Sequence, residues 1–255
     1  MPVLRLTTIL ILALTLSVSA LAASTAPPPF QARFDLRKGP LTLGEAHLSL
    51  ERPDDGRYRY RLHTFPVGVA RIFYDAEVRE ISEGRVTASG FRPDRYRYRR
   101  TGDHARVVEL RFNWSEGWVL NDVADRPWRM SVPDDAMDRV VTPLQLMHDL
   151  AVDAPSPLVY RIADGGHLRT YRLRREGEET VRTPLGKFHA VRVVRRAEDG
   201  ETVTRMWCAP ELHYLAVRVE QWEDGEGTVD MVLTRLEGMP LPERLKERAT
   251  GRVAR

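Results

Sequence analysis

The sequence predicts an all-β, mainly antiparallel fold: a curled sheet that forms a barrel or half-barrel, with one helix inserted near residues 142–152. Apolar and polar residues alternate along most of the chain after Phe30, which places one set of side chains on a core face and the other in solvent. Turn signals built around glycine separate the alternating runs. One stretch, residues 142–150, has the spacing of an amphipathic helix instead.

The alternating segments lie on both sides of the predicted helix. They cover residues 46–50, 58–62, 91–98 and 107–114 before it, and 158–162, 167–174, 179–181, 190–195, 203–208, 215–222 and 228–236 after it. Turn signals occur at 53–56, 82–84, 101–103, 115–117, 164–166, 198–200 and 223–225. Many short strands joined at this spacing are typical of an antiparallel sandwich, barrel or strongly curled sheet.

The predicted helix has a start signal and an apolar face. Thr142 can cap the helix, Pro143 fits its first turn, and Gln145 completes a capping box. The apolar face is formed by Leu144, Met147 and Leu150. Residues 134–141 could form a short helix before it.

The N-terminus predicts export. Arg5 precedes an apolar run at 6–18, and small residues follow at 20–22, so residues 1–22 are expected to be a secretory signal peptide. The expected organisation is then a flexible lead-in at 23–30, a single β domain at 31–238 and a charged tail at 239–255 that lacks core residues. Ala23 stands where a lipoprotein has cysteine, and no second run is long enough to span a bilayer. The expected compartment is the periplasm of a Gram-negative bacterium.

Composition narrows the list of partners. The chain has 39 Lys and Arg against 36 Asp and Glu, a net charge of +3, so nucleic acid is not an expected partner.

Cys208 is the only cysteine, which excludes an intramolecular disulfide. A buried, inert thiol is the expectation for Cys208, and a reactive thiol is the alternative.

No established catalytic motif is present. The seven histidines form no H-E-x-x-H pair, although His47 and His63 could face each other on adjacent strands. There is no G-x-S-x-G elbow and no glycine-rich phosphate loop, so neither a cofactor nor a metal is expected. Two weaker possibilities remain: a Cys208–His213 dyad, and a carboxylate pair drawn from Asp134, Asp135 and Asp138, which more often would cap a helix.

Several segments resemble the DUF3108 family of exported bacterial proteins. They are FDL at 34–36 followed by LGEA at 43–46, TPLGKFHAVRV at 183–193, similar to a T-x-x-G-x-F-x-A-x-x-V hairpin, and the block at 204–221 with its Trp, Tyr and Glu positions. Ala216 departs from the family's usual proline, and Thr142-Pro143 from its Asp/Ser pair. The resemblance implies a fold and a compartment, and it carries over no functional residues. At fold level the family is similar to the periplasmic lipoprotein carriers of the LolA and LolB type.

These observations favour an exported, non-catalytic envelope protein that binds an amphipathic ligand or partner in the concave face of its sheet. Lipid, lipoprotein and glycan are the candidates. The residues expected to contact the ligand are Trp114, Trp118, Trp128, Leu144 and Met147. The aromatic residues could instead be ordinary core and strand residues. Two further alternatives are an envelope enzyme acting on polysaccharide or peptide, and a scaffold that pairs through an edge strand. The oligomeric state stays open.

Overall fold

The computed structural model describes residues 26–54, 56–123, 126–197, 202–223, 226–242 and 245. The leader expected at 1–22, the first residues of the lead-in and most of the charged tail therefore lie outside the described residues. Among the residues it describes, no helix has the length and apolar character needed to cross a bilayer.

The described chain folds into one 15-stranded sheet with the order β8-β7-β6-β5-β4-β3-β2-β1-β15-β14-β13-β12-β11-β10-β9. The strands are β1 (Phe30–Lys38), β2 (Leu41–Glu51), β3 (Arg57–Pro66), β4 (Val78–Thr87), β5 (Gly90–Arg100), β6 (Arg106–Asn113), β7 (Trp118–Val123), β8 (Arg126–Ser131), β9 (Ala136–Asp138), β10 (Leu158–Asp164), β11 (His167–Thr183), β12 (Gly186–Arg196), β13 (Thr202–Ala209), β14 (Leu215–Glu223) and β15 (Glu226–Glu237). The helical segments are η1 (Gly68–Ile72), α1 (Thr142–Ala151) and η2 (Pro210–Leu212).

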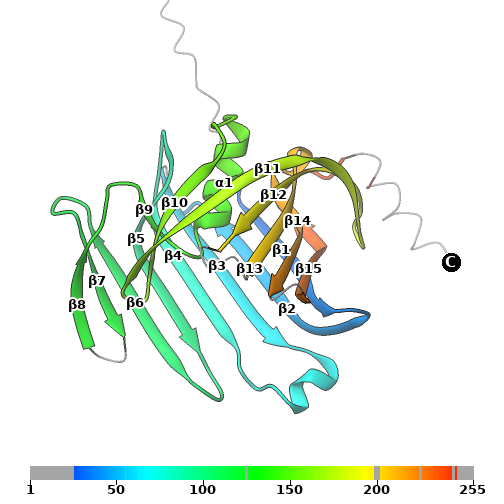
Figure 1. Ribbon diagram of the computed structural model, residues 1–255, viewed down its shortest axis with the longest axis horizontal. Coiled ribbons are helices and arrows are strands. Elements are labelled where there is room, and N and C mark those ends of the chain that lie inside the picture. The colour runs from blue at the N-terminus through cyan, green and yellow to red at the C-terminus, as the bar shows by residue number, and fades with distance from the viewer. Residues whose placement is uncertain are drawn as a thin grey trace, which may run out of the picture.

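The first and last strands pair with each other in the middle of the sheet, and two meanders spread outward from that pair. The outermost strands, β8 and β9, are consecutive in the sequence but are not hydrogen-bonded to each other. The sheet is therefore curled but not closed (Figure 1), and among the described strands only the β9–β10 pair is parallel. The predicted fold class, a mainly antiparallel curled sheet with one helix, is confirmed.

Alternation on the strands separates the core from the surface. Tyr58 and Tyr60 of β3 are almost fully buried, and Tyr96 of β5 likewise faces the core. The intervening arginines point outward, where Arg59 and Arg97 both bind the carboxylate of Glu83. The two Arg/Tyr runs of the sequence thus have the same cause: aromatic residues fill the interior while arginines solvate the outer face.

Helix α1 lies between the two halves of the curled sheet, where it contacts β5 and β14 (Figure 1). The side chains on its core side are Leu144, Leu146, Met147 and Leu150, none of them more than 3% exposed. The predicted helix is confirmed, but its capping box is not formed. The N-cap residue is Val141, and the buried Asp138 accepts the hydrogen bond of the Val141 N–H. Gln145 instead hydrogen-bonds to the backbone of Ser89 and Phe91.

Two local expectations are wrong. Residues 82–84 lie inside β4 and do not form a turn. Gly84 marks a register shift there, and a side chain at this position would lie 2.2 Å from the Arg92 carbonyl oxygen, so glycine permits a close approach of two strands. Residues 134–141 contain strand β9 and not a helix, because residues 136–138 pair with β10.

The ends of the described chain also join the core. Ala26, within the expected lead-in, is only 7% exposed. Leu245 is 5% exposed and fills the space beside Gly186, which adopts a φ of +149°. The expectation that the tail lacks core residues is therefore wrong at this position.

Replacing Leu144 by alanine should lower the free energy of unfolding by about 3 kcal/mol, because the substitution leaves a cavity at a fully buried site. Val152→Ala is the matched control, since Val152 is 46% exposed and its truncation should cost less than about 0.5 kcal/mol. Urea denaturation of both variants measures the difference. Equal losses would contradict the placement of this helix face in the core.

Candidate ligand pocket

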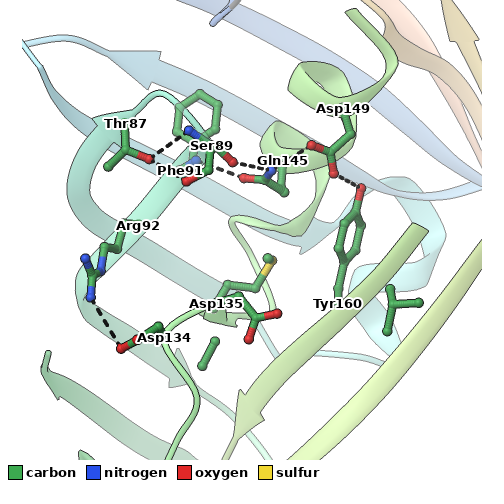
Figure 2. Close-up of a pocket in the computed structure, with 12 residues that line it drawn as sticks. Thr87, Ser89, Phe91, Arg92, Asp134, Asp135, Gln145, Asp149 and Tyr160 are labelled. Atoms are coloured by element: carbon green, nitrogen blue, oxygen red, sulfur yellow. Dashed lines mark hydrogen bonds and ion pairs between the residues drawn. The ribbon is translucent and has the colours of Figure 1, made fainter. Parts of the chain in front are cut away.

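A pocket of about 440 Å³ opens beside α1, between the start of β5, the segment that leads into β9, and β10 (Figure 2). Its lining combines carboxylates, one arginine and apolar side chains. The lining residues are Thr87, Ser89, Phe91, Arg92, Asp134, Asp135, Ala136, Met137, Gln145, Asp149, Val159 and Tyr160. The helix faces the core with its leucines and the pocket with its polar side.

Gln145 ties the helix to the β4–β5 turn. Its Oε1 accepts the Phe91 N–H at 2.8 Å, and its Nε2 donates to the Ser89 carbonyl at 3.0 Å. Gly90, with a φ of +107°, lies so close that a Cβ there would be 2.2 Å from Gln145 Oε1. The same Nε2 donates to Asp149 Oδ1 at 2.8 Å, so the amide also orients a carboxylate one helical turn later.

Asp149 is held in place at the pocket wall (Figure 2). The Tyr160 hydroxyl donates to its Oδ2 at 2.8 Å, and Gln145 binds the other oxygen. Burial raises the pKa of Asp149 above its ordinary value. A carboxylate that is partly desolvated and fixed by two donors is preorganised to accept a hydrogen bond from a ligand.

The opposite wall carries the arginine. Arg92 lies 3.9 Å from Asp134, and its guanidinium stacks 4.3 Å above the ring of Trp114. Trp114 is itself fixed by a 2.9 Å hydrogen bond from Nε1 to the Pro93 carbonyl. Asp135 is paired with Arg161. The pocket therefore offers both signs of charge, which suits a polar or zwitterionic group more than a purely apolar one.

The residues predicted to contact a ligand are not brought together. Leu144 and Met147 are buried in the core. Trp118 lies under Arg129, whereas Trp128 is 40% exposed and packs against Gly166 of the β10–β11 turn. None of them lines the pocket, and neither does Trp114, which reaches it only through Arg92. Their role in ligand binding stays a prediction.

The candidate acid cluster divides into two parts. Asp134 and Asp135 line the pocket, but Asp138 is fully buried. A 2.5 Å hydrogen bond joins Asp138 to Ser82, whose hydroxyl lies 2.9 Å from the Tyr58 hydroxyl. Burial raises the pKa of Asp138 to about 7. Asp138 accepts the N–H of Val141, so its contacts support the capping role at α1 and not the catalytic one.

The other candidates for chemistry were Cys208 with His213 and the pair His47 and His63. Cys208 is fully buried, and burial raises the pKa of its thiol to about 12. His213 is exposed, whereas the Cys208 thiol is buried, so the two side chains do not share a surface that a substrate could contact. His47 and His63 do face each other on β2 and β3, as expected. Within the described ranges no group of three or more potential metal ligands occurs.

The sequence pointed to Asp134 and Asp135 as candidate acids, but it pointed to Gln145 only as part of a capping box and to Asp149 not at all. Gln145 and Asp149 are four residues apart, so they share the helix face opposite the leucines. A polar pair at this spacing, on a helix whose other face is apolar, was the signal in the sequence that could have indicated a polar pocket wall. Arg92, Phe91 and Tyr160 gave none, because strand alternation does not tell which neighbours a distant helix will supply.

The chain is similar to known proteins in both sequence and fold. The model of the family described as "Protein of unknown function (DUF3108)" matches residues 31–234, which confirms the resemblance found in the sequence. A search of curated proteins finds no match. A solved β-barrel-like protein of the DUF1849 domain of unknown function, from Brucella abortus, is 10% identical with a TM-score of 0.55, and the alignment covers 84% of this chain and 99% of that one. A protein from Parabacteroides distasonis titled "putative lipoprotein" is 11% identical with a TM-score of 0.31, covering 84% and 98%.

The buried Asp138 should make stability depend on pH. Its pKa is raised from 3.8 to about 7, so between these values the folded protein holds a proton that the unfolded chain has released. The stabilisation is complete below about pH 4 and is lost as the pH rises through about 7. Wild type should therefore lose more unfolding free energy between pH 5 and pH 8 than Asp138→Asn. Urea denaturation of both proteins at both pH values tests this. The other titratable groups are common to the two proteins, so the difference between their pH profiles reports on Asp138. Parallel pH profiles would contradict it.

The thiol of Cys208 should resist alkylation in the folded protein, because it is fully buried and its pKa is about 12. N-ethylmaleimide should leave the native protein unmodified over hours and label it within minutes in urea, as read by intact mass. Rapid labelling of the native protein would restore Cys208 as a reactive group.

Proposed function

Because the chain belongs to the DUF3108 family of proteins of unknown function, we propose a role from the pocket itself. The protein is an exported, non-catalytic protein of the periplasm that binds an amphipathic envelope ligand. The ligand's polar part sits in the pocket beside α1, between Arg92 and Asp149. Lipid, lipoprotein and glycan are the ligand classes in question.

One observation carries this proposal: the interior of the curled sheet is filled, and a pocket lies at its mouth, the open end beside α1. The interior is occupied by large, fully buried side chains such as Phe34, Tyr60 and Phe188. The mouth keeps about 440 Å³ of space, a volume within the usual range for small-molecule sites. The mouth, and not the centre of the roll, is where a ligand can enter without repacking the core.

The lining supports an amphipathic ligand. Asp134 and Asp149 can accept hydrogen bonds from ammonium or hydroxyl groups, and Arg92 can bind a phosphate or carboxylate. Met137 and Val159 supply apolar surface beside these groups. A head group with donors, attached to an apolar or sugar moiety, satisfies both parts of the wall.

The scaffold alternative receives little support from the exposed edge of the sheet. Of the two edge strands, β9 has three residues, all buried, and β8 is the exposed one. Strand β8 carries Pro127 between Arg126 and Trp128. Proline lacks the N–H that an added strand would need, and charged residues on an edge discourage pairing.

Filling the pocket should abolish binding. Val159→Trp introduces a large side chain from a wall position that is 37% exposed, so the fold should tolerate it. Val152→Trp, outside the lining, is the matched control. Native mass spectrometry of protein purified from a bacterial periplasm should reveal a co-purified adduct, or one formed with added short-chain phosphatidylethanolamine or a chitin-type disaccharide. The adduct should persist in the control and disappear in Val159→Trp.

Two outcomes would refute the proposal. One is the absence of any co-purified or added ligand on the wild-type protein. The other is equal ligand retention by Val159→Trp and by its control. Circular dichroism spectra of both variants, matched to wild type, exclude misfolding as the cause of a lost adduct.

A further inference from the structure

One carboxylate in the pocket beside α1 has no cationic partner. The other carboxylates of the pocket and of the segment that follows α1 are each paired with an arginine. The pairs are Asp134 with Arg92 at 3.9 Å, Asp135 with Arg161, and Asp153 with Arg175. Asp149 differs from them, because no lysine or arginine of the described residues lies within 4.0 Å of its carboxylate. The pocket therefore keeps one negative charge that the protein does not pair.

More distant charges offset this carboxylate only in part. His148 and Arg175 both lower the pKa of Asp149, but burial, the largest effect, raises it above its ordinary value. Arg175 is engaged by Asp153. Arg172 is exposed on β11 and does not line the pocket. A cation that entered the pocket would therefore find Asp149 as an acceptor that is desolvated and not yet neutralised.

The donors next to Asp149 are already used. Both N–H groups of the Gln145 amide have acceptors, one in the Ser89 carbonyl and the other in Asp149 Oδ1. The Tyr160 hydroxyl gives its proton to Asp149 Oδ2. What this wall presents to an occupant is therefore oxygen lone pairs: those that remain on the carboxylate and on the Tyr160 hydroxyl.

The hydroxyl groups at the β4–β5 turn add no donor. Thr87 donates to the Gly90 carbonyl at 3.1 Å, so it accepts the proton of the Ser89 hydroxyl, which lies 3.0 Å away. Among the side chains that line the pocket, only the guanidinium of Arg92 has N–H groups left for a ligand, and it lies on the wall opposite Asp149. The wall formed by α1 and β10 can thus recognise a group that brings its own donors.

We propose, on the premise of the function proposed above, that the polar part of the ligand carries a protonated primary amine and that this amine binds Asp149. A primary ammonium supplies three N–H donors and the missing positive charge. A hydroxyl group would bring a donor but leave the carboxylate unpaired. A quaternary ammonium has the charge but no N–H. An aminolipid head group and an amino sugar both carry the required amine.

Two pairs of probes test this proposal, each pair differing only in acetylation of the amine. One pair is dihexanoyl phosphatidylethanolamine and its N-acetyl derivative. The other is the disaccharide of two glucosamine units and its N,N′-diacetyl form. Isothermal titration calorimetry of wild type should show that the free amine of at least one pair binds at least about tenfold more tightly than the acetylated form, the effect expected of a charge-assisted hydrogen bond. The pair that shows the preference identifies a lipid or a sugar as the source of the amine.

Asp149→Asn removes the charge and keeps the shape of the side chain. It should weaken binding of the free amine about tenfold and leave binding of the acetylated form within about twofold. Asp103→Asn is the matched control, because it changes the net charge equally at an exposed position of the β5–β6 turn, outside the pocket. This control should keep the amine preference of wild type.

The outcomes separate this inference from the proposed function. Equal affinity of wild type for the amine and acetylated forms, or an amine preference that persists in Asp149→Asn, overturns the inference while the pocket remains a ligand site. Wild type that binds none of the four probes and carries no co-purified adduct overturns the proposed function and the inference together. The wild-type comparison needs no substitution, so it decides even where circular dichroism shows that Asp149→Asn does not fold.

Discussion

Buried polar side chains, and not strand pairing, hold the segment around β9 against the inner face of β4. We call this contact the seam. Arg139, just after β9, donates two hydrogen bonds of 2.8 Å to the buried carboxylate of Glu80 in β4. Tyr96 donates to the same carboxylate, and Ser82 binds Asp138 two residues further along β4. The Arg139–Glu80 and Ser82–Asp138 contacts join residues more than fifty positions apart, on segments that no ladder of backbone hydrogen bonds connects. Since a buried charge left unpaired costs several kcal/mol, the seam is stable only when all of these partners are present.

This seam also determines where the pocket of the proposed ligand lies. Because β9 and α1 are drawn onto the inner face of β4 and β5, the leucine face of α1 fills the space that a wider barrel would leave empty. The polar face of the same helix, with Gln145 and Asp149, is left at the mouth. The structure is therefore a filled roll with a pocket at one opening, and not a barrel with a central cavity.

Period-two alternation and the helical spacing at 142–150 are local signals, so the strands, the helix and the fold class could be predicted. The positions of residues that are distant in the sequence but adjacent in the fold could not be predicted. The serine and glycine at 82–84 look like a turn, but Ser82 is buried as a partner for Asp138, and Gly84 allows β5 to approach. The tryptophans are close in sequence, yet the hairpins that carry them place Trp114 beneath Arg92 and Trp128 against Gly166. The pocket needs residues from β5, α1 and β10, and no local pattern records that meeting.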